Sequence, residues 1–181
     1  MKIIICVALI ITSAGLRTGL AEEKPIFAFN NVEYFHRWTE KNQHEFTPAK
    51  QEDLKKWSEM MTVNVYRDVH DGDQLASTAN AVLENYKNHH GMVMKTNSIP
   101  RTPDYPAEHF IAVAFPRQDF IELVFARFKL VDGTGCSFIF SHRIYGEKAG
   151  DQASAWLKTN APATEKALME WSSLPAPASL P

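Results

Sequence analysis

The chain has 181 residues, with 19 basic and 21 acidic side chains and a formal net charge of −2. Its two cysteines and its 45% hydrophobic content exclude a small disulfide-stapled scaffold and favour one domain with a buried core. The slightly acidic balance, without a run of Lys and Arg, argues against a nucleic-acid partner.

Residues 1–21 are predicted to be a signal peptide. Lys2 gives a positive start, Ile3–Ile11 form an apolar stretch shorter than a membrane span, and Gly19-Leu20-Ala21 supply the small residues of a cleavage site. Cleavage removes two basic residues, leaving 17 basic against 21 acidic, and also removes Cys6. We therefore expect an exported protein, periplasmic or extracellular, with Cys136 as its one thiol, no internal disulfide and no stable membrane span.

The first half of the mature chain reads as strands around one helix. An aromatic-rich run at 32–40 and a run at 44–47, joined by a polar turn, predict an opening hairpin. Residues 51–60 are expected to form a short helical turn, and 61–66 a β-branched strand. Apolar residues at helical spacing over 75–86 predict an amphipathic helix.

Residues at the two ends of this helix predict where it begins and ends. Asp71 or Asp73 can cap its start, and Gly91 can close its end in the left-handed conformation. A strand over 92–99 and an extended loop with three prolines follow.

The second half carries the predicted core. Three long apolar runs at 108–115, 119–130 and 136–145 are separated by short connections, which predicts an antiparallel meander of central strands covered on both faces. Residues 150–172 are expected to be helical, with Pro162 either kinking this helix or starting a second one. The proline-rich tail 173–181 is predicted to be disordered.

These elements predict a single α+β domain over residues 25–172. We expect an antiparallel sheet of about six to seven strands, packed by the amphipathic helix and the C-terminal helix. The element order of "EFTPAKQEDLKKWSEMMTVNVY", a strand ending in Thr-Pro, a short helix with Trp57 and a β-branched strand, resembles the Mog1/PsbP-like family, including its DcrB-type exported bacterial members. This resemblance implies a binding or assembly factor more than an enzyme. The chain lacks the lipid-attachment cysteine of the exported lipoprotein members, so the resemblance leaves membrane tethering open.

Two polar clusters invite a metal hypothesis. His89 and His90 are adjacent, so their side chains diverge by about 100° on a helix and suit a helix end better than one shared ion. The acidic run 68–73 superficially suits calcium, but its spacing is wrong, no closing glutamate follows, and aspartates before a helix serve as caps. Capping is the preferred interpretation of both clusters, a cation site is the alternative, and no metal or cofactor is predicted.

A catalytic set can be drawn from the core strands. The nucleophile, base and carboxylate would come from Ser141, Cys136, His109, His142, Glu108 and Glu122. Ser141 lacks the glycines of a nucleophile elbow, and consecutive strand residues face opposite sides of a sheet. His142 is therefore expected to be a hydrogen-bonded core histidine, and Cys136 a small buried hydrophobe.

The proline-stiffened segment 98–108 is the preferred binding candidate. A pre-ordered loop loses little entropy on recognition, and binding sites are common on loops held by a rigid sheet. The candidate residues are Arg101, Asp104, Tyr105 and Glu108, joined by Arg143 and Tyr145 if the strand ends converge.

The function predicted from the sequence is an exported, non-catalytic binding or assembly module. It would use this loop or one sheet face to bind a protein or a small ligand. The first alternative is a small hydrolase or metalloenzyme using His109, His142 and Glu108. The second is a structural envelope protein.

Overall fold

A computed structural model describes residues 23–181, so the signal peptide predicted for residues 1–21 lies outside the described part of the chain. The elements follow one another as β1 (Phe27–Phe29), β2 (Val32–Glu40), β3 (Gln43–Pro48), β4 (Glu59–Tyr66), α1 (Gly72–Asn88), β5 (Met92–Ile99), β6 (Glu108–Pro116), β7 (Phe120–Val131), β8 (Thr134–Tyr145), α2 (Ala149–Glu170) and the short 3-10 helix η1 (Pro177–Ser179).

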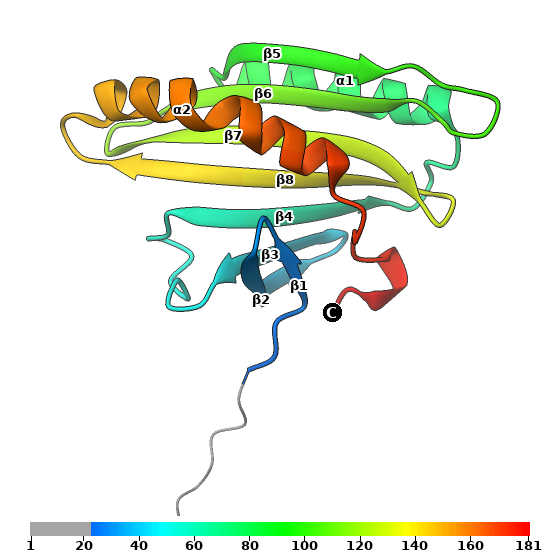
Figure 1. The fold of residues 1–181 in the computed structure, drawn as a ribbon, viewed down its shortest axis with the longest axis horizontal. Helices are drawn as coiled ribbons and strands as arrows, with labels where there is room; N and C mark the ends of the chain where they lie inside the picture. The colour runs from blue at the N-terminus through cyan, green and yellow to red at the C-terminus, as the bar shows by residue number, and fades with distance from the viewer. Residues whose placement is uncertain (1–22) are drawn as a thin grey trace, which may run out of the picture.

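The eight strands form one antiparallel sheet in the order β1-β2-β3-β4-β8-β7-β6-β5 (Figure 1). Strands β1–β4 make one meander and β5–β8 another, and the two meet where β4 pairs with β8. This arrangement arises because α1 carries the chain from β4 to the far edge, from which β5–β8 return strand by strand. The predicted α+β class is confirmed, with β1 raising the strand count above six to seven.

A two-residue turn aligns the two central strands. Asp132 and Gly133 have φ values of 49° and 74° between the paired residues Val131 and Thr134, as a tight hairpin turn requires. From this turn the β7–β8 register runs without interruption to the other end of the sheet, where Glu122 lies opposite Arg143.

Helices lie on both faces of the sheet, with α2 packed on β7 and β8 and α1 packed on β6 and β7. The predicted cover on both faces therefore holds for β7, whereas β8 is open on the α1 side. In Figure 1, α2 crosses in front of β6–β8 and α1 runs behind β5 and β6. The α2 face holds the larger apolar cluster, with Phe110, Phe125, Phe138, Phe140, Leu168 and Trp171 among its buried members. The α1 face holds the smaller one, with Leu75, Ala79, Ile111, Val113, Phe128 and Ile139.

Side-chain caps determine where α1 begins and ends. The Asp71 carboxylate accepts a hydrogen bond of 2.8 Å from the backbone N–H of Gln74, and Nδ1 of His89 donates one of 2.9 Å to the carbonyl of Asn85. The predicted capping role is therefore confirmed for Asp71 and His89. The left-handed residue is His90, with a φ of 63°, and not Gly91 as predicted.

Gly91 is required for close packing. A Cβ atom there would lie 2.6 Å from Cγ1 of Val113 and 2.8 Å from Cε1 of Phe115, so the chain enters β5 directly against β6.

The C-terminal helix α2 is a single helix with Pro162 inside it, so a second helix does not start there. Its Trp156, Leu157 and Leu168 side chains pack against the core of the sheet. Neither α1 nor α2, the helices of the described part, is long and apolar enough to cross a membrane.

Two predicted segments differ from the structure. Residues 51–58 form turns and bends without a helix. The tail 173–181, predicted to be disordered, instead packs on the domain: Pro175 is buried, and Leu174 and Leu180 contact the core. Its prolines forbid a regular helix or strand but not apolar packing.

Candidate functional site

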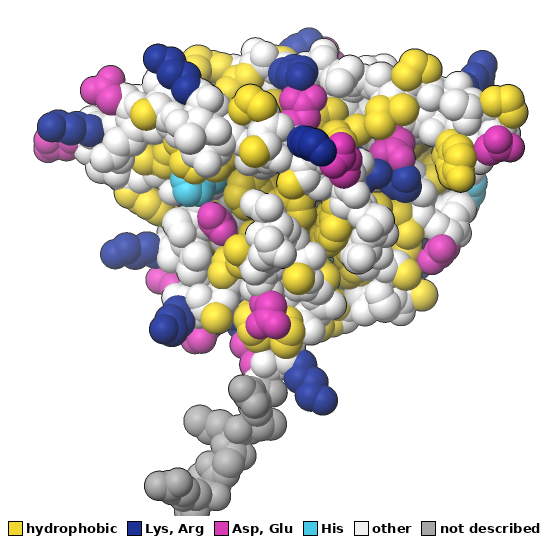
Figure 2. Space-filling model, in the orientation of Figure 1, with side chains coloured by type: hydrophobic (Ala, Val, Ile, Leu, Met, Phe, Trp, Pro, Cys, Tyr) yellow, Lys and Arg dark blue, Asp and Glu magenta, His cyan; other side chains and the backbone are white. Residues whose placement is uncertain are grey.

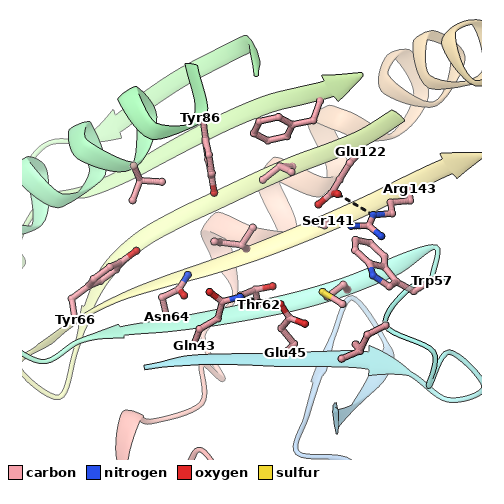
Figure 3. A pocket seen from close by; sticks show the side chains of 16 residues that line it. Gln43, Glu45, Trp57, Thr62, Asn64, Tyr66, Tyr86, Glu122, Ser141 and Arg143 are labelled. Atoms are coloured by element: carbon pink, nitrogen blue, oxygen red, sulfur yellow. Dashed lines mark hydrogen bonds and ion pairs between the residues drawn. The ribbon is translucent and has the colours of Figure 1, made fainter. Parts of the chain in front are cut away.

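One half of the α1 face of the sheet is uncovered and forms a groove. Helix α1 packs on β6 and β7, which leaves β8, β4 and β3 open on the same side (Figure 3). The resulting hollow has a volume of about 440 Å³. Its walls come from Gln43, Glu45, Leu54, Trp57, Met60, Thr62, Asn64, Tyr66, Val82, Tyr86, Phe115, Glu122, Val124, Ile139, Ser141 and Arg143.

An arginine stacked between aromatic rings closes one end of the groove. The guanidinium carbon of Arg143 lies 3.8 Å from the ring centroid of Trp57 and 4.4 Å from that of Phe120. Its Nε donates a hydrogen bond of 2.9 Å to Glu122, which faces it across the β7–β8 register. The Tyr145 hydroxyl donates to the Trp57 carbonyl at 2.9 Å, so β8 also holds the loop that carries this tryptophan.

The floor of the groove is polar because β4 alternates. Met61, Val63 and Val65 point into the core, while Met60, Thr62 and Asn64 face the groove. Asn64 Nδ2 donates to the Ser137 hydroxyl at 3.1 Å, and the Tyr66 hydroxyl lies 3.1 Å from the same oxygen. On β3, Gln43 Nε2 donates to Glu45 at 2.9 Å.

Three hydroxyl groups facing the groove make no hydrogen bond within residues 23–181. They belong to Thr62, Tyr86 and Ser141, which stand on β4, α1 and β8. Ser141 is 5% exposed, so a ligand would reach its hydroxyl through the groove. Burial, then the neighbouring Tyr66 and Glu122, raises the pKa of Tyr86, which keeps its hydroxyl a neutral donor. Unpaired polar groups in a hollow are typical of a site that binds a polar ligand.

The structure separates the residues predicted for the binding loop. Arg101, Asp104 and Tyr105 line another hollow of about 580 Å³ beside the start of α1, where Arg101 lies 3.7 Å from the exposed Asp73. Glu108 instead faces α2 and pairs with Arg127 and Lys129.

Arg143 and Tyr145 lie at the opposite end of the sheet from this loop. Both β6 and β8 run antiparallel to β7, so the start of β6 and the end of β8 are far apart. The strand ends therefore do not converge, so the condition for adding Arg143 and Tyr145 to the loop is not met, and a binding role for the predicted residues stays a prediction.

The predicted catalytic set is not assembled. His109 borders a hollow against α1, with its Nδ1 2.9 Å from the Ser98 hydroxyl, whereas His142 stacks on Trp156 of α2 with ring centroids 4.6 Å apart. The sheet thus stands between the two imidazoles. Nδ1 of His142 has no hydrogen-bond partner, so the expectation of a hydrogen-bonded core histidine fails at this atom.

The remaining reactive residues take structural positions. Cys136 is buried, and burial together with the charge of Asp132 raises its pKa to about 12, which keeps the thiol protonated. Among residues 23–181, no group of three or more His, Cys, Asp or Glu side chains is arranged to hold a metal ion.

The groove residues were largely missed from the sequence. The sequence predicts a short helical turn at Trp57, an apolar stripe that ends at Tyr86, and a strand through Thr62, without bringing the three together. The signal that could have found them is on β4, where the polar residues Thr62 and Asn64 alternate with apolar ones. The long apolar runs of β6, β7 and β8 show no such alternation. Such alternation indicates a strand with one face open.

These observations define an antiparallel α+β domain with a helix on each face and an open groove beside one of them. Residues 21–172 match the model of one protein family, and the chain belongs to that family. Among curated proteins, none matches the sequence.

Two solved structures are similar to this chain to different degrees. The Saccharomyces cerevisiae Ran-binding protein Mog1p is similar with a TM-score of 0.53 at 9% identity, over 82% of this chain and 89% of that one. Human STARD10 gives a TM-score of 0.32 at 9% identity, over 76% of this chain and 74% of that one. The likeness to Mog1p confirms the predicted Mog1/PsbP-like architecture.

Proposed function

We propose that this protein is a non-catalytic binding module and that the groove between α1 and strands β3, β4 and β8 is its ligand site. The carrying observation is the set of three unpaired hydroxyls, on Thr62, Tyr86 and Ser141, that converge on one hollow from three elements. Mog1p is a Ran-binding protein, which supports a binding role for this fold. The separation of His109 and His142 disfavours the hydrolase alternative.

The chemistry of the walls suits a small, uncharged, polyhydroxy ligand such as a neutral sugar. Glu45 and Glu122 outweigh Arg143, so the lining has a net formal charge of −1, which disfavours an anion. Apolar side chains from α1, β7 and β8, including Val82 and Ile139, face hydroxyls and amides on β4 and β3. A sugar ring presents a similar combination of an apolar face and hydroxyl groups.

The test uses the mature chain labelled with 5-fluorotryptophan and followed by ¹⁹F NMR. Trp57 borders the groove, whereas Trp156 and Trp171 pack on the α2 face. We expect methyl glucoside and N-acetylglucosamine to shift the Trp57 resonance saturably, and citrate to leave it unchanged. The double variant T62V/S141A removes two hydroxyls at nearly constant volume and should weaken binding about tenfold or more, at roughly 1 kcal/mol for each hydrogen bond.

The matched control is S154A/T159V, which removes two exposed hydroxyls from α2. It should bind as the natural chain does. No saturable change at Trp57 with either neutral probe, a tighter response to citrate, or equal binding by T62V/S141A would each overturn the proposal.

Export belongs to the same proposal. It is supported by the positive start, apolar stretch and small residues of the first 21 positions. Expression of the full chain in a bacterium should yield a periplasmic protein whose N-terminus, by mass spectrometry, begins after Ala21. A full-length cytoplasmic product would contradict export without affecting the groove.

A further inference from the structure

Strand β5 is an edge of the sheet with an unusual concentration of exposed apolar side chains. All eight of its residues are exposed, and it pairs with β6 alone. Residues 23–181 have seven exposed large hydrophobic side chains, and five lie on β5 or on the loop after it: Met92, Val93, Met94, Ile99 and Tyr105. Figure 2 shows apolar side chains along the upper edge, over the position of β5 in Figure 1.

This edge lacks most of the features that protect natural sheets from edge-to-edge pairing. The opposite edge, β1, has three residues, whereas β5 has eight. The one charge on β5, Lys95, is held at 2.7 Å by Glu165 of α2 in the same molecule. Hollows of about 420 and 380 Å³ flank the strand on the α1 and α2 sides, so neither helix covers it fully.

We propose that β5 pairs with β5 of a second copy, antiparallel and centred on Asn97, so that two sheets join across a two-fold axis. The register irregularity between Val93 and Lys95 confines regular pairing to residues 95–99. Within that stretch, pairing about Asn97 places Lys95 opposite Ile99 of the second copy, and Thr96 opposite its Ser98.

In this register, each paired residue lies on the same face of the sheet as its partner in the second copy. Lys95, Asn97 and Ile99 lie opposite β6 residues 112, 110 and 108, which face α2. Thr96 and Ser98 lie opposite residues 111 and 109, which face α1. Directly opposed residues in an antiparallel pair share a face, so this register needs no side chain to change sides.

The same register covers the apolar residues outside the regular stretch. Continued past the irregularity, it brings Met92–Met94 of one copy beside residues 100–102 of the other, in the loop that carries Tyr105. Tyr105 is 72% exposed in the single chain. The loop predicted from the sequence for binding would thus contact the second copy.

A second copy suits this edge better than an unrelated peptide because the edge is complementary to itself. The two-fold axis repeats every apolar contact. It also brings the amide of Asn97 to that of the second copy, where Oδ1 would exchange the 2.9 Å bond that it accepts from the Ser98 N–H for bonds across the axis. A pairing this short lies below the interface of about 800 Å² per partner of stable complexes, so we expect a dissociation constant in the micromolar range. The inference does not depend on the groove, which lies at β3, β4 and β8.

Cysteine cross-linking tests the register. Opposed Cα atoms in an antiparallel pair lie about 4.5–5.5 Å apart, which is within disulfide range. Under mild oxidation N97C should form a disulfide-linked dimer, because the natural Cys136 is buried and does not compete. The matched control is A28C, an exposed position on the opposite edge strand β1, which should stay monomeric.

Charge exchange tests the two-fold symmetry. N97K and N97D each place like charges across the axis and should shift sedimentation equilibrium toward monomer, whereas their mixture should dimerise at least as well as the natural chain. The exposed position makes both variants compatible with the fold.

A monomer at every concentration, with equal cross-linking of N97C and A28C, would overturn the proposal. A dimer that neither charge variant weakens would also overturn it. Binding of an extended apolar peptide to a chain that stays monomeric would replace the second copy with another partner.

Discussion

Arg127 joins the sheet to the end of α2. Its guanidinium pairs with Glu108 at 2.7 Å and donates to the carbonyls of Leu168 and Trp171 at 2.9 Å each. The side chain is 5% exposed, and Glu108 also pairs with the more exposed Lys129. A buried cation is tolerated here because a carboxylate and two carbonyls at the end of α2 surround it.

Replacement of Arg127 by methionine should therefore destabilise the domain strongly. Glu108 loses its buried partner, and the last carbonyls of α2 lose their donor. We expect the free energy of unfolding, measured in urea, to fall by about 3–5 kcal/mol. Lys129→Met is the comparison, because it removes the half-exposed partner of the same carboxylate and should cost about 1 kcal/mol. Equal losses would contradict this division of roles.

His142 should make stability depend on pH. Burial beneath Trp156 lowers the pKa of His142, and the Ser58 carbonyl opposes this to a smaller degree. Glu59 of β4 lies directly opposite His142 in the β4–β8 pair. Above pH 6.5 the imidazole is neutral in both states; as the pH falls toward the lowered value, the unfolded chain takes up the proton first and stability is lost.

His142→Phe should keep the ring packing and reduce the fall in unfolding free energy as the pH drops below 6.5. Part of the fall should remain, because burial also lowers the pKa of His44 and His109. The comparison is Ser154→Ala at an exposed position of α2, which removes no titratable group and should leave the slope unchanged. A slope in H142F as steep as that of the natural chain would exclude His142 as its source.

At the scale of elements, Gly91 allows the connection between α1 and β5 to pack closely against β6. Gly91→Ala would drive a methyl group into Val113 and Phe115, and we expect about 1–3 kcal/mol of destabilisation by thermal or urea unfolding. Gly150→Ala in α2 is the matched control, since no atom lies within 4 Å of its Cβ position, and it should be neutral or stabilising by about 0.5–1 kcal/mol. Similar losses in both variants would contradict the packing explanation.

At the scale of the whole molecule, the two helices should produce a gradient of stability across the sheet. Amides of β7, which has a helix on both faces, and of its central neighbour β8 should exchange with deuterium most slowly, and those of the edge strands β1 and β5 fastest. Hydrogen exchange by mass spectrometry at submicromolar concentration measures this below the expected dimerisation range. Equal protection of β5 and β7 in the monomer would contradict it.

The antiparallel sheet and its two helices were predictable because their signals are local. The apolar runs that became β6, β7 and β8, the Asp132-Gly133 turn and the cap at Asp71 each act within a few residues. Hydrophobic periodicity and turn chemistry are sufficient for such features.

The groove and the separation of the catalytic candidates were not predictable in this way. Which half of a sheet face α1 covers depends on packing between residues far apart in the sequence, such as Tyr86 and Phe115. The alternation on β4 indicates one open face, but it does not say which other residues line that face. Likewise, His109 and His142 are equivalent polar interruptions of core strands until the register assigns them to opposite faces.

By itself, the sequence determined the α+β class, the order of the long strands and the two α-helices, and the cap at Asp71, since each depends on neighbours along the chain. Only the tertiary structure decided that Thr62, Tyr86 and Ser141 share one hollow and that β5 is a bare edge. These facts depend on how strands distant in sequence pair and on which faces remain uncovered. Contacts at long sequence separation, and not the composition of any segment, establish both.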